Sequence, residues 1–464
     1  MSIKLCKSLV ISGFILYIFY ILLSNHPCCY SSNIFTKLRQ KDPKYSDPHF
    51  IPTNLSHVVF GIAGSSKTWR NRRWYVETWW RPNITRGYVF MDRFPKEFLP
   101  WPPSSPPFRI SQDTSSYKHY DKHPNPQAIR MAHLILETFK AENEGVRWYV
   151  LADDDTVVFI NNLEDVLARY DHSKYFYIGM NSESHASNVY HSFSMAFGGA
   201  GYALSYPLAK ALVNNLDVCI KRYPTLYGSD HILQSCVADL GVSLTLEKGF
   251  HQIDVHSDIS GLLSAHPQSP LLSLHHLDFV NPIFPYMNQN ESLNHLMEAA
   301  KTDESRLLQQ SICYHKPKNW SFSISWGYTV QLYEAIFPPS ILQRPLQTFT
   351  PWSKSVWPLF VFNTRIPSKN PCEAPRVFFF DSVENRSGDH FITSYSRRKP
   401  PSFPPCLSTG NHSADNVSKI YVISPTWKHD PIGNRRECCD IMYITGTNTT
   451  EIKLRNCLEN EIVP

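Results

Sequence analysis

Apolar and polar positions divide the chain into a short tail and four longer parts. Residues 1–7 form a basic tail, and an uncharged apolar run from Ser8 to Ser24 follows it, close to the ~20 residues that a membrane-spanning helix needs. Residues 25–55 are polar, basic and proline-containing, which is typical of a stem. Residues 56–288 alternate apolar segments with helix-like ones. From 289 to 464, prolines, aromatic residues and strand-like runs dominate.

The central part predicts an α/β fold with a mostly parallel sheet. Its apolar run at 57–66 predicts a strand and a turn, residues 87–92 predict a second strand, and residues 127–142 predict a helix. Residues 147–160 (RWYVLADDDTVVFI) predict a strand, an acidic turn and another apolar segment. Ligands of such folds bind at the carboxyl ends of the strands, which is where the acidic turn falls.

Proline content and short apolar runs characterise two other segments. Residues 94–107 (FPKEFLPWPPSSPP) are too rich in proline for regular structure. The last part is expected to be a β-rich appendage, because the runs at 320–333, 376–380 and 419–424 are strand-like. It offers few ionisable groups for catalysis, so its role stays open.

The apolar N-terminal run predicts a single-pass signal-anchor. Lys4 and Lys7 precede it, so the positive-inside rule places the tail in the cytosol and the bulk in the lumen. A cleaved signal peptide is the alternative, but no small-x-small cleavage site follows closely. Ten of the eleven cysteines and eight N-x-[ST] sequons follow the run, in agreement with a luminal, disulfide-bonded bulk. The sequon asparagines are Asn54, Asn83, Asn290, Asn319, Asn385, Asn411, Asn416 and Asn448.

Composition narrows the class of protein. Hydrophobic residues make up 42% of the chain and charged residues only 18%, which favours a folded, loop-rich, extracytoplasmic protein over a disordered one. The net charge of +5 is spread over short basic clusters. A nucleic-acid-binding protein would show a denser basic stripe, so we expect no nucleic-acid partner.

Three consecutive carboxylates, Asp153, Asp154 and Asp155, are the strongest chemical signal. An acidic turn is usually only solvated, but here it lies between the buried segments VLA and VVFI. Carboxylates so close together repel one another unless a cation neutralises them. Because side chains alternate in extended structure, Asp153 and Asp155 can reach one cation while Asp154 points away. Mg²⁺ or Mn²⁺ held in this way keeps coordination positions for diphosphate oxygens.

Two histidines in SLHHLD (273–278) offer a nitrogen ligand for the same cation. A histidine pair in an apolar strand is more often a satisfied core feature. The acidic triplet already requires ligands, however, so we expect one of His275 and His276 to join it. Adding nitrogen to oxygen ligands favours Mn²⁺ over Mg²⁺.

Two further segments offer a candidate base and a glycine-rich turn. In YGSDH (227–231), Ser229 or Asp230 suits a helix N-cap, and Asp230 also suits a general base that takes a proton from an acceptor hydroxyl. In FGGAGYALS (197–205), the glycines permit close backbone approach to a sugar or diphosphate, although a packing turn would also use them.

The order and spacing of these segments resemble the fringe-like glycosyltransferases, a β-1,3-type group with the GT-A fold, and most closely their plant fringe-related relatives. The similarity extends from about His57 to Pro285. It is carried by Arg72, Arg73, Thr78 and Trp79, by RWYVLADDD, FGGAGYALS and YGSDH, and by GFHQID with SLHHLD. Animal fringe proteins have an acidic pair after a proline where this chain has GSDH (228–231), which leaves the acceptor open.

The resemblance implies a role for each matching residue. It places Asp153, Asp155 and His275 at the metal, with His276 as the alternative imidazole, and makes Asp230 the base. It assigns the nucleoside to Asp92 and the sugar to the glycine-rich turn. The implied donor-binding residues are Asp92, Arg72, Arg73, Asp153, Asp154, Gly199, Ala200 and Gly201.

We therefore expect an inverting, metal-dependent glycosyltransferase that moves one sugar from a UDP-sugar to a hydroxyl of a glycan or glycoprotein. The expected cofactor is Mn²⁺, with Mg²⁺ as the alternative, and the expected location is the Golgi membrane in type II orientation. One alternative is a luminal metallophosphoesterase that uses the triplet with His231, His275 and His276. The other is a non-catalytic glycan-binding descendant of the fold. The donor sugar, the disulfide pairing and the oligomeric state stay open.

Overall fold

The computed structural model describes most of the chain beyond the first 51 residues. The described residues are 52–115, 123–386, 388–397, 406, 413–431, 435–443 and 448–462. The predicted tail, membrane anchor and nearly all of the stem lie outside them. No helix in the described part is long and apolar enough to cross a membrane. Thr53–Pro464 group into one compact unit.

A seven-stranded sheet forms the centre of the first region, and its pairings are mostly parallel as predicted. The first strand pairs in parallel with the second and fourth, whereas β7 (Tyr202–Ser205) runs antiparallel to both of its neighbours. The fourth strand ends at Asp153, so the acidic turn lies at its carboxyl end. In spatial order the strands are β3 (Phe108–Ile110), β2 (Arg86–Met91), β1 (Val58–Ala63), β4 (Trp148–Asp153), β7 (Tyr202–Ser205), β6 (Tyr177–Gly179) and β8 (Leu244–Leu246).

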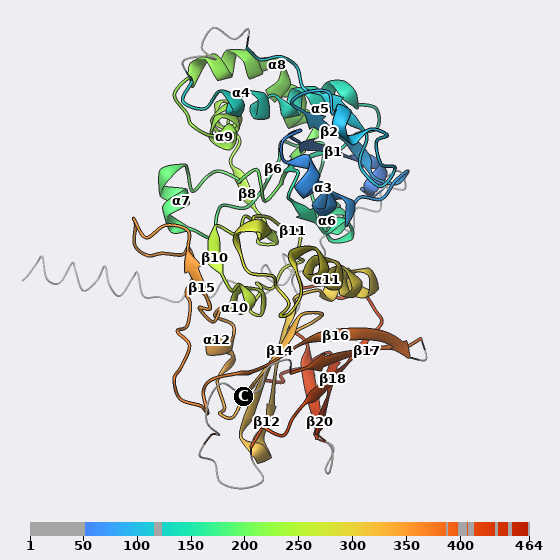
Figure 1. Cartoon of the computed structure of the whole chain (residues 1–464), viewed down its shortest axis with the longest axis vertical. Helices are drawn as coiled ribbons and strands as arrows, with labels where there is room; N and C mark the ends of the chain where they lie inside the picture. Colours follow the sequence, from blue (N-terminus) through green and yellow to red (C-terminus); the bar gives the residue numbers. More distant parts are fainter. Residues whose placement is uncertain are drawn as a thin grey trace, which may run out of the picture. The chain divides into compact units, whose positions relative to one another are not determined.

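Helices cover both faces of this sheet, which makes the region a mixed α/β structure (Figure 1). One face packs against α4 (Pro126–Ala132), α5 (Leu134–Ala141), α8 (Tyr206–Arg222) and α9 (Ser229–Asp239). A disulfide between Cys219 and Cys236 joins α8 to α9. The other face packs against α3 (Trp69–Glu77) and α6 (Ile160–Leu167). The predicted helix at 127–142 is thus two short helices, α4 and α5, separated at His133.

A small sheet beside the acidic turn brings distant segments together. Its strands, in spatial order, are β5 (Val157–Val158), β11 (Ser273–Leu274) and β9 (Phe250–His251). The middle strand pairs antiparallel with β5, directly after the aspartates, and parallel with β9. This pairing places the SLHHLD segment beside the acidic turn.

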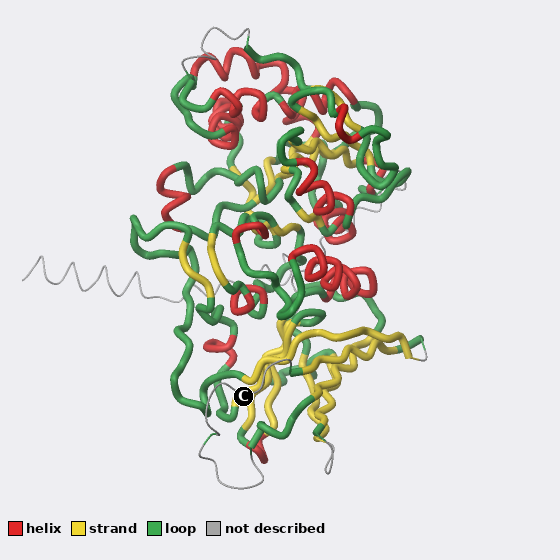
Figure 2. The backbone as a smooth tube through the Cα atoms, viewed as in Figure 1, coloured by secondary structure: helices red, strands yellow, loops and turns green. Residues whose placement is uncertain are grey.

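The second region is dominated by an eight-stranded, mostly antiparallel sheet (Figure 2). All three predicted strand-like runs lie in it. In spatial order its strands are β12 (Gln310–His315), β13 (Trp320–Ser325), β14 (Thr329–Tyr333), β16 (Arg376–Arg386), β17 (His390–Ser396), β18 (Lys419–Pro425), β20 (Thr449–Arg455) and β19 (Cys438–Tyr443). Three disulfides connect its segments: Cys313–Cys439, Cys372–Cys406 and Cys438–Cys457.

Two local expectations need correction. The region after residue 288 opens with a helix, α11 (Gln289–Asp303), whose start is fixed by a capping box between Asn288 and Glu291. The proline-rich segment 94–107 contains a single 3₁₀ turn at Lys96–Phe98, where three residues free of proline allow it.

The remaining short helices and strands are α7 (His185–Tyr190), β10 (Val255–Ser257), α10 (Ser260–Leu263), α12 (Pro339–Leu342) and β15 (Phe349–Pro351), with 3₁₀ turns at Leu55–His57, Leu277–Phe279, Glu304–Arg306 and Lys316–Lys318.

Candidate active site

The acidic turn is held in place by hydrogen bonds that its own sequence supplies. Thr156 accepts from the Asp153 amide at 3.0 Å and donates its hydroxyl to the Gly199 carbonyl at 2.7 Å. The Trp79 indole donates to the Thr156 carbonyl at 3.0 Å. The turn is therefore tied both to the segment after α3 and to the glycine-rich loop. These contacts fix the backbone of the turn that carries the three carboxylates.

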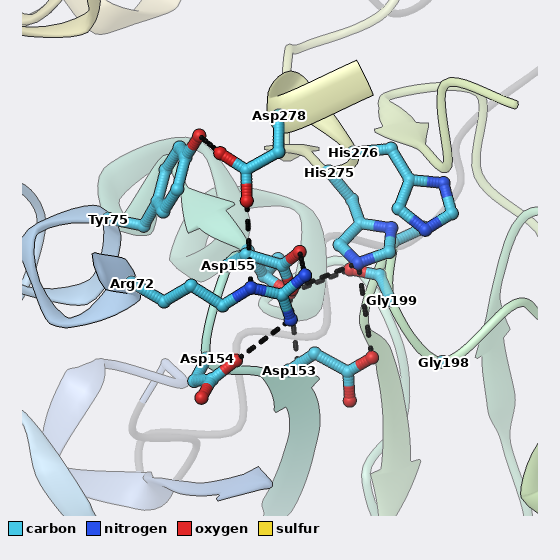
Figure 3. A network of polar contacts seen from close by, with 12 residues as sticks. Arg72, Tyr75, Asp153, Asp154, Asp155, Gly198, Gly199, His275, His276 and Asp278 are labelled. Carbon is cyan, nitrogen blue, oxygen red and sulfur yellow. Dashed lines mark hydrogen bonds and ion pairs between the residues drawn. The ribbon is translucent and has the colours of Figure 1, made fainter. Parts of the chain in front are cut away.

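Asp153, Asp155 and His275 converge at the end of β4. His275 Nε2 lies 3.1 Å from Asp155 Oδ1 and 3.9 Å from Asp153 Oδ2 (Figure 3). One ligand atom from each of the three residues lies within 4.8 Å of the other two. Asp155 and His275 are almost fully buried, whereas a quarter of the Asp153 side chain is exposed. The site is consequently reachable from the Asp153 side.

The three residues fit a hard divalent cation. Ligand atoms at right angles around an octahedral ion, each about 2.1 Å away, are separated by about 3 Å. The 3.1 Å between His275 Nε2 and Asp155 Oδ1 matches this spacing, whereas the 3.9 Å from His275 Nε2 to Asp153 Oδ2 is longer. His275 Nδ1 is buried without a hydrogen-bond partner among the described residues, whereas Asp155 Oδ2 forms an ion pair with Arg72 at 3.0 Å. The donor set of two carboxylates and one imidazole suits Mn²⁺.

Asp154 points away from the cluster, as the alternation of side chains predicts. Its carboxylate accepts a hydrogen bond from the Thr68 hydroxyl at 3.0 Å and one from Arg72 at 3.2 Å. The same guanidinium lies 3.0 Å from Asp155 Oδ2 and 3.6 Å from Asp278. Figure 3 shows Arg72 between these three carboxylates. Arg72 therefore offsets part of the negative charge around the site.

Burial and mutual repulsion shift the acidity of the triplet. Burial raises the pKa of Asp153 to about 7, an effect that His275 partly opposes and Asp155 reinforces. Burial and the charge of Asp155 raise the pKa of Asp154 to about 6, despite Arg72. Burial also acts to raise the pKa of Asp155, but His275 and Arg72 outweigh it and hold the value at about 2. Two carboxyls are thus poorly stabilised as anions by the protein alone.

The glycine pair separates the candidate base from the metal cluster. A Cβ on Gly198 would lie 2.4 Å from Asp230 Oδ1, and a Cβ on Gly199 would lie 2.0–2.5 Å from the His275 ring. A larger residue at either position would therefore displace the side chain of Asp230 or the ring of His275. The Gly198 amide donates to Asp230 Oδ2 at 2.8 Å. Burial raises the pKa of Asp230, and the Gly198 hydrogen bond only partly opposes this effect.

The N-cap interpretation of Ser229 and Asp230 is wrong. Gly228 is the N-cap residue of α9, and no side chain caps the helix. Asp230 lies in the first turn and is engaged by Gly198 instead. The disulfide between α8 and α9 fixes the helix that carries it. A partly buried carboxylate with a raised pKa suits proton abstraction.

The other predicted donor-binding residues have diverse surroundings. Asp92 is partly exposed and accepts from the Ser66 amide at 2.7 Å; burial acts to raise its pKa, but the bonds from Ser66 leave it lowered. Within the described residues, Arg73 forms no ion pair with the triplet. The Ala200 amide donates to the Gln252 side chain and the Gly201 amide donates to the Gly198 carbonyl, so both amides are already engaged. Donor contacts by these residues remain predictions.

The structure also contains supporting residues that sequence reasoning did not assign. His276 Nδ1 lies 3.0 Å from Asp254, which also accepts from Ser182 at 2.6 Å. Glu183, almost fully buried, contacts His251 Nδ1 at 2.9 Å and accepts from the Ile253 amide at 2.8 Å. These contacts fix His276 and the segment 251–254. In the sequence, the motif GFHQID already indicates His251 and Asp254, because its polar side chains interrupt an apolar run.

A second group of candidate metal ligands in the described part of the chain is Cys438, Cys457 and Glu461. Its two sulfurs form a disulfide with each other, so neither is available as a thiolate. The Asp153 cluster is the metal candidate that the geometry favours.

Comparisons with known proteins show what the chain as a whole is similar to. The family described as "Protein of unknown function, DUF604" matches residues 187–439. A beta-1,3-glucosyltransferase of Mus musculus is 30% identical over 120 residues, and one of Homo sapiens is 28% identical over 120 residues. Each alignment covers 25% of this chain and 23% of the relative. The apo crystal structure of mouse xyloside xylosyltransferase 1 matches with a TM-score of 0.27 and 9% identity, over 44% of this chain and 85% of that chain.

Proposed function

The chain belongs to the DUF604 family, and we propose that it is a metal-dependent, inverting glycosyltransferase with a GT-A-type catalytic region, a UDP-sugar donor and a glycan or glycoprotein acceptor. The observation that carries the proposal is the juxtaposition of two different acidic sites. Asp153 and Asp155 face His275, and Asp230 lies on the other side of two consecutive glycines. The similarity to beta-1,3-glucosyltransferases makes UDP-glucose the first donor to test.

Asp153, Asp155 and His275 would hold Mn²⁺. When bound, the cation would supply positive charge for the diphosphate of the donor, which becomes more negative as the sugar leaves. Arg72 lies at the same carboxylates and contributes a second positive charge beside this position. A leaving diphosphate therefore has electrostatic support from the protein itself as well.

Asp230 would act on the acceptor side. Direct displacement with inversion requires the acceptor hydroxyl to attack from the face of the sugar opposite the diphosphate. A base must then stand apart from the metal, and the Gly198–Gly199 backbone separates the two groups. Because the Asp230 pKa is raised, this carboxylate accepts a proton more readily than an exposed aspartate.

The secretory setting remains part of the proposal. Four disulfides in the described residues support an oxidising compartment. Seven sequon asparagines fall within the described residues, and all seven are exposed, as glycan attachment requires.

We propose a type II orientation in the Golgi membrane. A glycosidase should increase the gel mobility of the expressed chain, and protease added to sealed microsomes should spare its bulk; digestion of the bulk would contradict this topology.

The function is tested by measuring UDP release from UDP-glucose, UDP-galactose and UDP-N-acetylglucosamine by the purified full chain. We expect Mn²⁺-dependent release from one donor, abolished by EDTA and restored by Mn²⁺. A phosphoester substrate such as p-nitrophenyl phosphate serves as the control for the hydrolase alternative. Phosphoester turnover without UDP release from any sugar nucleotide would overturn the proposal.

A further inference from the structure

One segment of the C-terminal part of the chain, residues 346–365, extends onto the first region. Its two ends lie side by side, because Leu346 and Arg365 pair in a parallel β-bridge. Between them, β15 pairs antiparallel with β10, and the two strands lie side by side in Figure 1. Farther along the segment, Phe360 forms a β-bridge with Ser184. Backbone pairing therefore holds the 346–365 segment against the first region at two separate places.

Trp352 follows β15 directly, and its ring lies among aromatic rings of the first region. It is nearly parallel to the ring of His256 on β10, with centroids 4.6 Å apart and planes at 16°. It is also parallel to the ring of His276, with centroids 5.1 Å apart and planes at 2°. Phe279 meets it edge-on at 5.2 Å. Trp352 thus connects the C-terminal part of the chain to the residue that follows His275.

His276 has a backbone conformation that needs support from its surroundings. Its φ is 54° and its ψ is 25°, in the left-handed region that residues other than glycine seldom adopt. Such a conformation persists where neighbouring groups enforce it. Asp254 holds the ring at Nδ1, 3.0 Å away, and Trp352 packs parallel to the same ring. These two contacts fix the His276 side chain and, with it, the turn that carries the metal-site imidazole.

The orientation of His275 depends on packing against its neighbours. A metal-binding histidine is usually oriented by a hydrogen bond from its other ring nitrogen, but His275 Nδ1 has no such partner among the described residues. Its ring lies 4.0 Å from that of His276, centroid to centroid, and Gly199 is also against it. Figure 3 shows the two imidazoles side by side, with His275 directed at the aspartates. A displacement of His276 would therefore be transmitted to His275.

We propose that Trp352 is a positioning residue of the metal site: its indole supports His276, and His276 in turn holds the His275 ring toward Asp153 and Asp155. This role rests on the proposed function, because it requires that the cluster binds Mn²⁺. The C-terminal part of the chain then has a defined task. It supplies a side chain that shapes the metal site and that residues 56–288 alone do not contain.

Calorimetric titration of Mn²⁺ into the full chain compares Trp352→Leu with Trp357→Leu. Both substitutions remove an indole from the same segment, but Trp357 is 84% exposed and serves as the matched control. We expect the Mn²⁺ affinity of Trp352→Leu to be about tenfold lower, the lower end of the effect when the support of a metal ligand is lost. The affinity of Trp357→Leu should not change. Trp352→Phe keeps a flat ring and should recover most of the affinity.

Electron spin-echo spectroscopy of the bound Mn²⁺ supplies a readout that a general loss of stability would not change. The nitrogen of a coordinated imidazole modulates the echo. We expect this modulation in the unmodified chain and in Trp357→Leu, and a weaker one in Trp352→Leu. Trp352 is partly exposed, so the Leu variant should fold, and Trp352→Gln removes the ring in a second way if it does not.

The outcomes separate this role from the proposed function. Unchanged Mn²⁺ affinity and echo modulation in the variants without the Trp352 ring would overturn the positioning role, whether or not the unmodified chain releases UDP. The expected loss in Trp352→Leu, together with no UDP release from any sugar nucleotide by the unmodified chain, would overturn only the catalytic proposal. Absence of Mn²⁺ binding by the unmodified chain would overturn both.

Discussion

Two buried charge clusters in this molecule are satisfied in different ways. Arg306, with no exposed surface, donates from Nε and Nη2 to both oxygens of Glu437, at 2.9 and 2.8 Å. Its Nη1 contacts Asp303 and the Pro425 carbonyl. In the acidic cluster of the first region, by contrast, His275 Nδ1 is buried without a hydrogen-bond partner among the described residues, while Asp155 Oδ2 forms an ion pair with Arg72 at 3.0 Å.

The difference indicates what each cluster is for. The Arg306 cluster joins the segment after α11 to the C-terminal sheet, and every polar group of its guanidinium is used by the chain. The acidic cluster combines a raised pKa at Asp153 with a buried His275 Nδ1 that has no hydrogen-bond partner among the described residues. A purely structural cluster has no reason to retain that cost. A cation from solution would remove it.

The largest expected effect is on turnover, from Asp230→Asn. Asparagine keeps the size of the side chain and can still accept from the Gly198 amide, but it cannot take the acceptor proton. Sugar transfer should fall roughly 10²–10⁴-fold, the usual range for loss of a general base. UDP affinity and the melting temperature should stay close to those of the unmodified chain. Unchanged turnover in steady-state assays would leave the reaction without this base.

A substitution in the Arg306 cluster should lower the stability of the fold. Arg306→Met leaves Glu437 and Asp303 buried without their cation, which should lower the free energy of unfolding by about 3–5 kcal/mol. Denaturant unfolding measures this, with Arg93→Met as the control. Arg93 pairs with Glu97 on the surface, so its loss should cost less than about 1 kcal/mol. Equal costs in the two variants would refute the assignment of Arg306 to a buried structural cluster.

The two glycines allow the metal and base functions to be separated. The added Cβ of Gly199→Ala would displace the His275 ring, so Mn²⁺ affinity should fall about 10–100-fold, as when other metal-ligand positioning is lost. Gly198→Ala would instead displace Asp230, reducing turnover while Mn²⁺ affinity is maintained. Calorimetric Mn²⁺ titration and UDP release on both variants check this. Identical profiles for the two substitutions would argue against separate sites.

The smallest expected effect concerns Glu304, a buried carboxyl between the two regions. Burial raises its pKa from 4.5 to about 7, and the hydrogen bonds from Asn161 and Asn162 oppose this only in part. Its contribution to stability is therefore complete below pH 4.5 and is lost as the pH rises through 7. The melting temperature should decline from pH 5 to 8 less steeply in Glu304→Gln than in the unmodified chain. Parallel pH profiles would show that Glu304 is not the group responsible.

Much of the fold was predictable because local patterns decide it. Period-two and continuous apolar runs located β1, β4, β13, β14 and β18, and the capping box at Asn288 and Glu291 was readable although we did not predict a helix there. The triplet and the SLHHLD segment indicated the metal cluster because carboxylates at a strand end require a partner. Their actual proximity depends on the pairing of β5 with β11, which lie more than a hundred residues apart.

The features of the site that were not predicted depend on tertiary contacts, which local sequence patterns do not indicate. His275 and His276 are equivalent by pattern, and only the fold directs one to Asp155 and the other to Asp254. The glycines of the turn were expected to admit a ligand, whereas Gly198 and Gly199 make room for Asp230 and His275. Arg72 matched a family motif, but its position among three carboxylates required the packing of α3 against the turn.

Direct titration of Mn²⁺ into the full chain tests most directly the claim that a divalent cation completes the acidic cluster. Asp155→Asn and its neighbour Asp154→Asn are compared, because both lose one negative charge but only Asp155 faces His275. We predict one bound Mn²⁺ per unmodified chain, a similar affinity in Asp154→Asn, and loss of binding in Asp155→Asn. No Mn²⁺ binding by the unmodified chain, or equal binding by the two variants, would contradict the account.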